Sequence, residues 1–314
     1  MTTKRCALVA ACLFPAVFAA AQPPPTPPLG PHYAADIERY RAWRVNDDKV
    51  NWVTLAGLFW LKPGAHSFGT SKDNDIVLPA GSTANHAGRL SFDRGEVTVV
   101  MNPGVPATIE GKPVNTAKLL SDRSGGNRHP TILQLGRLQL KVIDRGQRTG
   151  LRVKDTESPK LKAFHAPAWY PIDPAYHVTA EWEPGDGSRK IVVPNILGDA
   201  NVVTIPGVAH FTLHGQRFTL TPVEGDPARS MMFVFADATT KKETYPAGRM
   251  VDAGPVKDGK LEIDFNMAYN PPCAVTTFAT CPLAPRENRL STAVHAGAKF
   301  GAKERAAHAA PRLP

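Results

Sequence analysis

Carboxylate, hydroxyl and amide side chains gather between Asp264 and Arg289, and two of the carboxylates could transfer protons. Asp264 and Glu287 could act as a general acid and a general base, with Tyr269 as a hydrogen-bond donor. Paired carboxylates of this kind hydrolyse glycosides when the distance between them is suitable. The pattern therefore supports one hypothesis, a cofactor-independent hydrolase that uses Asp264 and Glu287.

A second hypothesis from the same residues is a binding module with a polar C-terminal cleft. Arg249 could clamp an anion, because a guanidinium presents a rigid fork of donors. The amides of Asn266, Asn270 and Asn288 could supply further ligand contacts. Binding of an unidentified small-molecule or surface ligand is the leading hypothesis, and the hydrolase is the alternative.

A structural interpretation of the cluster stays open beside both functions. Asp264 and the asparagines could cap turns, because loop backbone groups need partners that strands do not supply. Arg249 or Arg289 would then neutralise Glu287 or Asp264 in an ion pair. The sequence does not decide between a cleft and a packed network.

Cys273 and Cys281 lie on this stretch and enclose seven residues. No CxxC motif and no nearby histidine accompanies them, so zinc ligation is poorly supported. Because the other two cysteines fall within the first 21 residues, a Cys273–Cys281 disulfide is expected in an exported protein.

Composition limits the class of protein. The chain has 314 residues, 42% hydrophobic and 21% charged, which is typical of globular proteins, and its 25 Gly and 30 Pro favour strands and turns. The formal net charge is +9, but no dense basic stripe with aromatic residues is present, which argues against nucleic-acid binding. No phosphate-loop, dinucleotide, G-x-S-x-G or HExxH motif occurs, so we expect no cofactor and no metal.

The N-terminus is typical of a signal peptide covering residues 1–21. Lys4 and Arg5 precede an apolar run to Phe18, and three alanines before Gln22 form a cleavage site. A lipoprotein box ending at Cys12 is the less favoured alternative, because its apolar run is too short. We expect a periplasmic or secreted protein with no transmembrane segment in the mature chain.

Hydrophobic periodicity divides the mature chain into successive segments. A Pro-rich linker at 22–33 precedes the segment 34–62, which holds a helix and an apolar strand. The helix is predicted from Ala34 to about Asp48, because Ile37 and Tyr40 share one face, and the strand over residues 52–61. Short strands then follow at 63–158, including a hairpin over 137–155. The region 159–300 is expected to hold antiparallel strands and the cysteine loop, with a hairpin turning at His214 and alternation that leaves His177 facing solvent. The tail at 301–314 is predicted to be disordered.

The segment from His66 to Val114 resembles a forkhead-associated (FHA) domain in Phe68-Gly69 and in Asn74-Asp75-Ile76-Val77-Leu78. The resemblance implies a β-sandwich. The phosphothreonine-binding residues of that family are replaced here by Gly69-Thr70, Ser82-x-x-x-His86 and Glu110-Gly111. The arginine that would grip a phosphate is absent, so phosphothreonine binding is not expected.

Most of the mature chain also resembles the family of unknown function DUF1684. The resemblance lies in residues 51–74, 150–163, 169–178, 237–249 and 264–290, and in the sequence VPNILG at 193–198. It implies no established activity. The predicted fold is mostly β: an FHA-like β-sandwich followed by an antiparallel β-sheet or barrel-like domain, with one N-terminal helix.

Overall fold

The computed structural model describes residues 26–124, 129–302 and 304–305 of the chain. The predicted signal peptide with Cys12, and most of the predicted tail, lie outside these residues. The described strands form several mainly antiparallel sheets and no closed barrel, which confirms the mostly β prediction. None of the helices in this part of the chain is both long and apolar enough to cross a membrane.

The helix α1 (Tyr33–Asp47) begins and ends within one residue of the predicted bounds. A wide helical turn, η1 (Asp48–Val53), continues it, and the strand β1 (Leu55–Trp60) follows. The prediction of a strand from Trp52 onward was therefore wrong for its first residues. The helical path persists there, since the Thr54 hydroxyl donates to the Val50 carbonyl at 2.7 Å.

Two sheets pack face to face in the N-terminal region, which we call the sandwich. Their facing side chains form one apolar core, with alternate residues of each strand pointing inward. One sheet has the order β1, β11 (Arg148–Asp155), β10 (Leu138–Arg145), β9 (Leu133–Leu135), β6 (Thr108–Ile109), β7 (Lys112–Pro113). The other has the order β3 (Ile76–Val77), β2 (Gly64–Gly69), β4 (Gly88–Asp93), β5 (Glu96–Met101), β8 (Thr116–Leu119).

The C-terminal region has three open sheets, and its largest core lies between the first two of them. The first has the order β16 (Gln216–Leu220), β15 (Gly207–Leu213), β12 (His177–Pro184), β20 (Lys260–Asp264). The second has the order β17 (Glu224–Asp226), β18 (Ser230–Phe235), β19 (Arg249–Ala253), and the third pairs β13 (Lys190–Pro194) with β14 (Ala200–Thr204). Short helical turns join these strands: α2 (Lys160–Ala163), η2 (Pro174–Tyr176), η3 (Phe265–Met267), η4 (Pro272–Ala274) and η5 (Arg286–Asn288).

The predicted hairpin at His214 is formed by β15 and β16. Leu213 and Gln216 close its two-residue turn, in which His214 and Gly215 have φ of 50° and 77°. Two positive φ angles suit a turn whose twist matches the flanking strands, and glycine adopts one of them without strain. This hairpin is confirmed.

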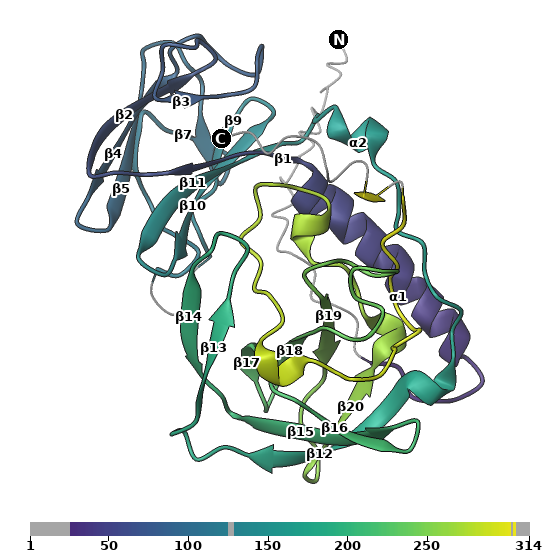
Figure 1. Ribbon diagram of the computed structural model, residues 1–314. Coiled ribbons are helices and arrows are strands. Elements are labelled where there is room, and N and C mark those ends of the chain that lie inside the picture. Colours follow the sequence, from purple (N-terminus) through teal and green to yellow (C-terminus); the bar gives the residue numbers. More distant parts are fainter. Residues whose placement is uncertain (1–25, 125–128, 303, 306–314) are drawn as a thin grey trace, which may run out of the picture.

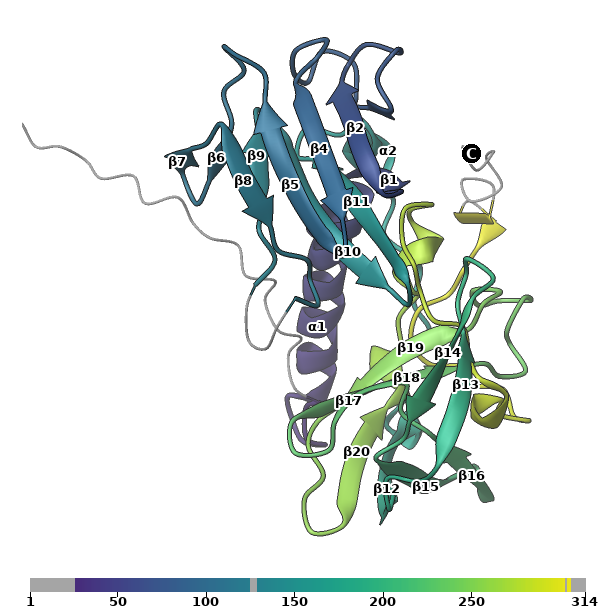
Figure 2. The ribbon, with the colours of Figure 1, turned by 90° about the vertical axis from the view of Figure 1, so that its left-hand side faces the viewer.

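The helix α1 lies along the C-terminal region and reaches the sandwich at one end (Figures 1 and 2). Its buried face carries polar groups as well as apolar ones. The Arg41 guanidinium donates to the Tyr170 carbonyl at 3.1 Å, and the Arg44 guanidinium stacks 4.0 Å from the centre of the Tyr269 ring. These contacts fasten the helix to the C-terminal region.

Candidate functional site

Asp264 is fully buried and holds the helix α1 in place. Its carboxylate accepts hydrogen bonds from the Tyr33 hydroxyl at 2.8 Å and from the backbone and side-chain amides of Asn266, both at 2.9 Å. The Asn266 carbonyl oxygen in turn accepts from the backbone N–H of Asp173 at 3.0 Å. One candidate catalytic residue and one candidate ligand-binding residue therefore join three distant segments of the chain.

His177 connects this buried carboxylate to the surface. Its side chain is only 5% exposed, so the prediction that it faces solvent was wrong, because Tyr33 of α1 packs over the imidazole. Its Nδ1 lies 3.8 Å from Asp264, and its Nε2 lies 3.0 Å from the exposed carboxylate of Glu262. Burial raises the pKa of Asp264, against the opposing effect of its hydrogen bonds.

Arg249 is occupied inside the C-terminal region. Its side chain is 1% exposed and forms a 2.8 Å ion pair with Asp237, which is equally buried. The guanidinium also donates to two backbone carbonyls near the C-terminal end of the described chain, at Val294 and Ala296. Arg249 therefore neutralises Asp237. The structural interpretation expected it to neutralise Glu287 or Asp264 instead, and that choice of partner was wrong.

The other predicted ligand-binding amides also make internal bonds. Asn288 is fully buried, and its side chain bonds the backbone of Thr221 and Val234 at 2.7–2.9 Å. The Asn270 amide donates to the Lys299 carbonyl at 2.8 Å, and its buried carbonyl oxygen has no hydrogen-bond partner. Among the described residues these amides close a packed network.

The three candidate catalytic residues lie in different surroundings. Tyr269 is buried and donates to Asp252 at 3.1 Å. Burial, together with the nearby Asp252 carboxylate, raises the pKa of the Tyr269 hydroxyl well above its usual value. Glu287 is exposed on η5, and its side chain forms no hydrogen bond or ion pair with a described residue. Among the described residues, no hydrogen bond or ion pair links these three side chains to one another.

Cys273 and Cys281 are paired, as predicted. Their Cα atoms are 6.3 Å apart, a separation that a disulfide spans. The loop between them carries Thr280, which contacts the sandwich, so the pair also fixes part of the junction between the two β regions. Among the described residues no group of three or more His, Cys, Asp or Glu is arranged to hold a metal ion.

The FHA-like segment has the predicted sandwich strands, and its polar side chains make local bonds. The Ser82 hydroxyl donates to the Pro79 carbonyl at 2.6 Å, and His86 Nδ1 lies 3.3 Å from the Asn74 side chain. These contacts fit the structural role expected for His86. The absence of phosphothreonine binding stays a prediction.

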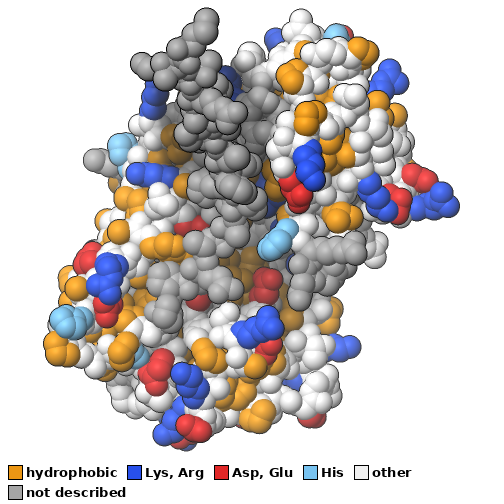
Figure 3. Space-filling model, turned by 180° about the vertical axis from the view of Figure 1, so that it is seen from behind, with side chains coloured by type: hydrophobic (Ala, Val, Ile, Leu, Met, Phe, Trp, Pro, Cys, Tyr) orange, Lys and Arg blue, Asp and Glu red, His pale blue; other side chains and the backbone are white. Residues whose placement is uncertain are grey.

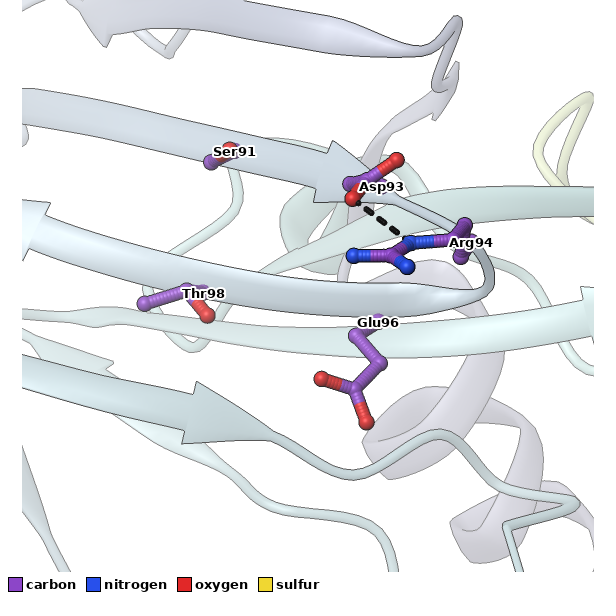
Figure 4. A pocket seen from close by; sticks show the side chains of 5 residues that line it. All are labelled: Ser91, Asp93, Arg94, Glu96 and Thr98. Carbon is purple, nitrogen blue, oxygen red and sulfur yellow. Dashed lines mark hydrogen bonds and ion pairs between the residues drawn. The ribbon is translucent and has the colours of Figure 1, made fainter.

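A hollow of about 490 Å³ lies on the outer face of β4 and β5 (Figure 4). Its charged groups have partners: Arg94 bonds Asp93 at 3.1 Å, and Glu96 pairs with Lys118. All of these side chains are largely exposed, so the hollow presents no uncompensated charge and is not our candidate site.

The junction between the sandwich and the C-terminal region contains a different arrangement. The strands β10 and β11 turn alternate side chains into the sandwich core, and their opposite faces carry Lys141, Arg145 and Arg152, which we call the basic cluster. Lys141 and Arg152 are direct cross-strand partners in the antiparallel pair. Their side chains therefore leave the sheet from neighbouring positions.

One cation of the basic cluster has an acidic partner, and two do not. Arg145 pairs with Asp122 at 2.8 Å and donates to the Thr280 hydroxyl at 3.1 Å. Arg152 is 4% exposed, lies 5.7 Å from the centre of the Trp52 ring, and makes no hydrogen bond or ion pair with any described residue. Lys141 is half-buried and has no such partner either.

The pKa values of Lys141 and Arg152, the two cations without partners, are both lowered. Burial, reinforced by the positive charge of Arg152, lowers the pKa of Lys141 to about 8. Burial, reinforced by Arg145, lowers the pKa of Arg152 to about 10. Asp122 opposes both effects, but it is already paired with Arg145. An anion at the junction would be favoured by the two cations that lack partners.

Sequence reasoning missed the basic cluster, although a signal was present. In the predicted hairpin over residues 137–155, the positions that alternate with the apolar ones are mostly Lys or Arg. On an exposed sheet such residues would face water and need no explanation. Only the packing of the C-terminal region against this face makes their charge unusual. On the face in Figure 3, by contrast, acidic and basic side chains are interspersed.

The fold and the junction define a two-part β protein with one docked N-terminal helix. Residues 162–299 match the model of the family described as "Protein of unknown function (DUF1684)", which confirms the predicted resemblance for this part of the chain.

The chain is also similar to several solved structures. One is an uncharacterized protein of Haloarcula marismortui, 29% identical, with a TM-score of 0.38 over 45% of this chain and 80% of that one. Another is the FHA domain of FhaA, 15% identical, with a TM-score of 0.22 over 31% of this chain and 97% of that one. A third comes from a study of phosphothreonine-dependent FHA interactions, at 14% identity, a TM-score of 0.22 and coverage of 31% and 92%. No curated protein matches the chain.

Proposed function

We propose that the protein is a binding module whose ligand carries negative charge and lies at the junction between the sandwich and the C-terminal region. The observation that carries this proposal is the burial of Arg152 without an acidic partner among the described residues. Because a guanidinium keeps its charge when buried, it needs an anion or several acceptors near it.

The energetic argument favours a ligand over a structural role for Arg152. A buried charge loses its hydration, and a partner has to offset that cost. The nearby Trp52 ring offsets part of it, since a desolvated cation–aromatic contact is worth about 2 kcal/mol. A bound anion would supply the remaining interaction, and the free protein would be less stable than the complex.

The same geometry gives less support to the hydrolase that would use Asp264 and Glu287. Hydrogen bonds from Tyr33 and Asn266 occupy the Asp264 carboxylate, and Glu287 is exposed without a described partner. General acid–base catalysis needs both groups within hydrogen-bond reach of one substrate. Binding is therefore the function that we propose.

The location of the protein is part of the proposal. We infer that it acts after export, because a Cys273–Cys281 disulfide persists in an oxidising compartment. Mass spectrometry of the exported protein should find Gln22 at the N-terminus. Lipid attached to Cys12 would instead show that the lipoprotein alternative is correct.

A thermal-shift screen tests the binding function. Wild type is compared with Arg152→Met and with Arg148→Met, which removes a partly exposed cation of the same strand that is paired with Asp199 at 2.7 Å. Anionic compounds should raise the melting temperature of wild type and Arg148→Met, and should leave Arg152→Met unchanged, because ligands that bind only the folded state stabilise it.

Two results of the screen would overturn the proposal. One is that no anionic compound stabilises wild type, and the other is that stabilisation survives in Arg152→Met. If a compound is also consumed over time and Glu287→Gln stops its turnover, the hydrolase replaces the binding module.

A further inference from the structure

The charge of the junction indicates how many negative charges the ligand group should carry. The three cations of the basic cluster face one described carboxylate, Asp122, which pairs with Arg145. The neighbouring Lys154 lies near the carboxylate of Asp47, which also pairs with Arg44 at 3.3 Å. Two positive charges, those of Lys141 and Arg152, are therefore left without a described counter-charge.

The two charges also start from the same place on the sheet. Lys141 and Arg152 are directly opposite each other in the antiparallel register. Side chains at opposite positions have Cβ atoms about 5 Å apart, so both heads can reach one small group. A phosphate monoester, or a free phosphate or sulfate ion, places two negative charges on one centre, whereas a dicarboxylate separates them along a carbon chain.

The walls of the site suit the oxygens of such a group. The Arg152 guanidinium provides a fork of parallel N–H donors, and the Lys141 ammonium provides a compact charge. The Thr280 hydroxyl and the Trp52 ring border the cluster from the disulfide loop and from η1. The cationic donors thus lie on the sandwich strands, and the Trp52 ring lies beside Arg152.

We propose that the ligand binds through a doubly charged oxyanion group, which Arg152 and Lys141 hold together. This inference rests on the proposed binding function and adds the chemical class of the ligand. Arg152 makes the paired hydrogen bonds, and Lys141 supplies the second charge. The group belongs to a phosphate monoester, or to free phosphate or sulfate.

The pH dependence of binding follows from Lys141. Arg145, Arg152 and Lys154 face Lys141 with positive charge, and Asp122 faces it with negative charge. Because burial holds the pKa of the free lysine near 8, the affinity for a permanent dianion should fall as the pH rises above about 8. Lys141→Arg keeps its charge at pH 9 and should retain the affinity.

Titration calorimetry with simple ions tests the class of ligand. The probes are inorganic phosphate, inorganic sulfate, succinate and acetate, each at constant ionic strength and pH 7.5, with wild type, Arg152→Gln, Lys141→Gln and the control Arg148→Gln. Phosphate or sulfate should bind wild type and the control, and each site variant should weaken binding about 10-fold or more. A preference for phosphate over sulfate assigns the ligand to phosphate monoesters or free phosphate.

The outcomes separate this inference from the proposed function. If succinate or acetate binds as tightly as phosphate and sulfate, and Arg152→Gln abolishes that binding, the binding module stands and the doubly charged group is rejected. If none of the four ions binds, or if binding is unchanged in both site variants, the doubly charged group is also rejected. In that case the thermal-shift screen alone decides whether the junction binds another anion.

Discussion

Two regions of this molecule are rich in charged and polar side chains, and they differ in how those side chains are satisfied. In the stretch from Asp264 to Arg289 and its neighbour Arg249, each buried charged side chain has partners, and most of the buried amides bond the backbone or one another. In the basic cluster, Arg152 is just as inaccessible and has no partner among the described residues. The contacts of the first region hold the fold together, and the second is the site that we propose for an anion.

A concentration of polar residues does not by itself mark a binding site. Irregular backbone needs many hydrogen-bond partners, and asparagine and aspartate supply them. A charge removed from water without a counter-charge has no such structural explanation. Substitutions in the first region should therefore mainly change stability, and substitutions in the basic cluster should mainly change anion binding.

The largest effect is expected from breaking the ion pair inside the first region. Asp237→Asn leaves the Arg249 guanidinium buried without its carboxylate and should lower the free energy of unfolding by about 3–5 kcal/mol. Urea unfolding monitored by circular dichroism measures this loss. Asp199→Asn, which breaks the exposed pair with Arg148, is the matched control and should cost at most about 1 kcal/mol.

The next effect is a pH dependence of stability that is expected from Asp48, the residue directly after α1. Burial, opposed by Arg44 at 3.2 Å and reinforced by Asp47, raises the pKa of Asp48 to about 6. The folded protein thus binds a proton more readily than the unfolded chain, and the free energy of unfolding should fall by about 3 kcal/mol in total as the pH rises from about 3 to about 7.

Urea unfolding at a series of pH values measures this slope in wild type and in Asp48→Asn. The variant has no carboxyl group to titrate, so its slope should be smaller in that interval. Equal slopes in the two proteins would mean that Asp48 makes no such contribution.

Removing the disulfide should have a smaller effect, and it should lower both the stability of the fold and the affinity for an anion. Replacing Cys273 and Cys281 by serine frees a short loop and should lower the free energy of unfolding by about 2–3 kcal/mol. Because the loop carries Thr280, which bonds Arg145, anion affinity should fall modestly as well. Full affinity in the double variant would show that the loop is not a wall of the site.

The smallest effect is expected at Glu287. Its side chain is exposed and has no described partner, so Glu287→Gln should change the free energy of unfolding by no more than about 0.5 kcal/mol. Anion binding should be unchanged. A loss of ligand response in this variant would move the site back to the stretch that the sequence favoured.

The sequence predicted much of the fold because its local patterns are strong. Period-2 alternation located the β10–β11 hairpin, and the apolar spacing around Ile37 located α1. The turn at His214 followed from its glycine. The helical turn that continues α1 as far as β1 was not predicted. It includes a hydrogen bond from the Thr54 hydroxyl to the Val50 carbonyl, which no sequence pattern indicates.

The site could not be predicted in the same way, because its decisive contacts are distant in the chain. Tyr33 and Asp264 bond across 231 positions, and Arg145 reaches Thr280 across 135. Alternation shows that Arg152 points away from the sandwich core, but it does not show what covers that face. The predicted functional residues were therefore those with the most polar neighbours in sequence.

The most direct test of this account is the stability of ligand-free Arg152→Met. If Arg152 is a buried charge without a counter-charge in the ligand-free protein, an apolar side chain of similar length should increase the free energy of unfolding by about 1–4 kcal/mol. Urea unfolding in buffer without phosphate or sulfate measures the difference from wild type. A lower free energy of unfolding in the variant would show that Arg152 stabilises the free protein, which contradicts the proposed site.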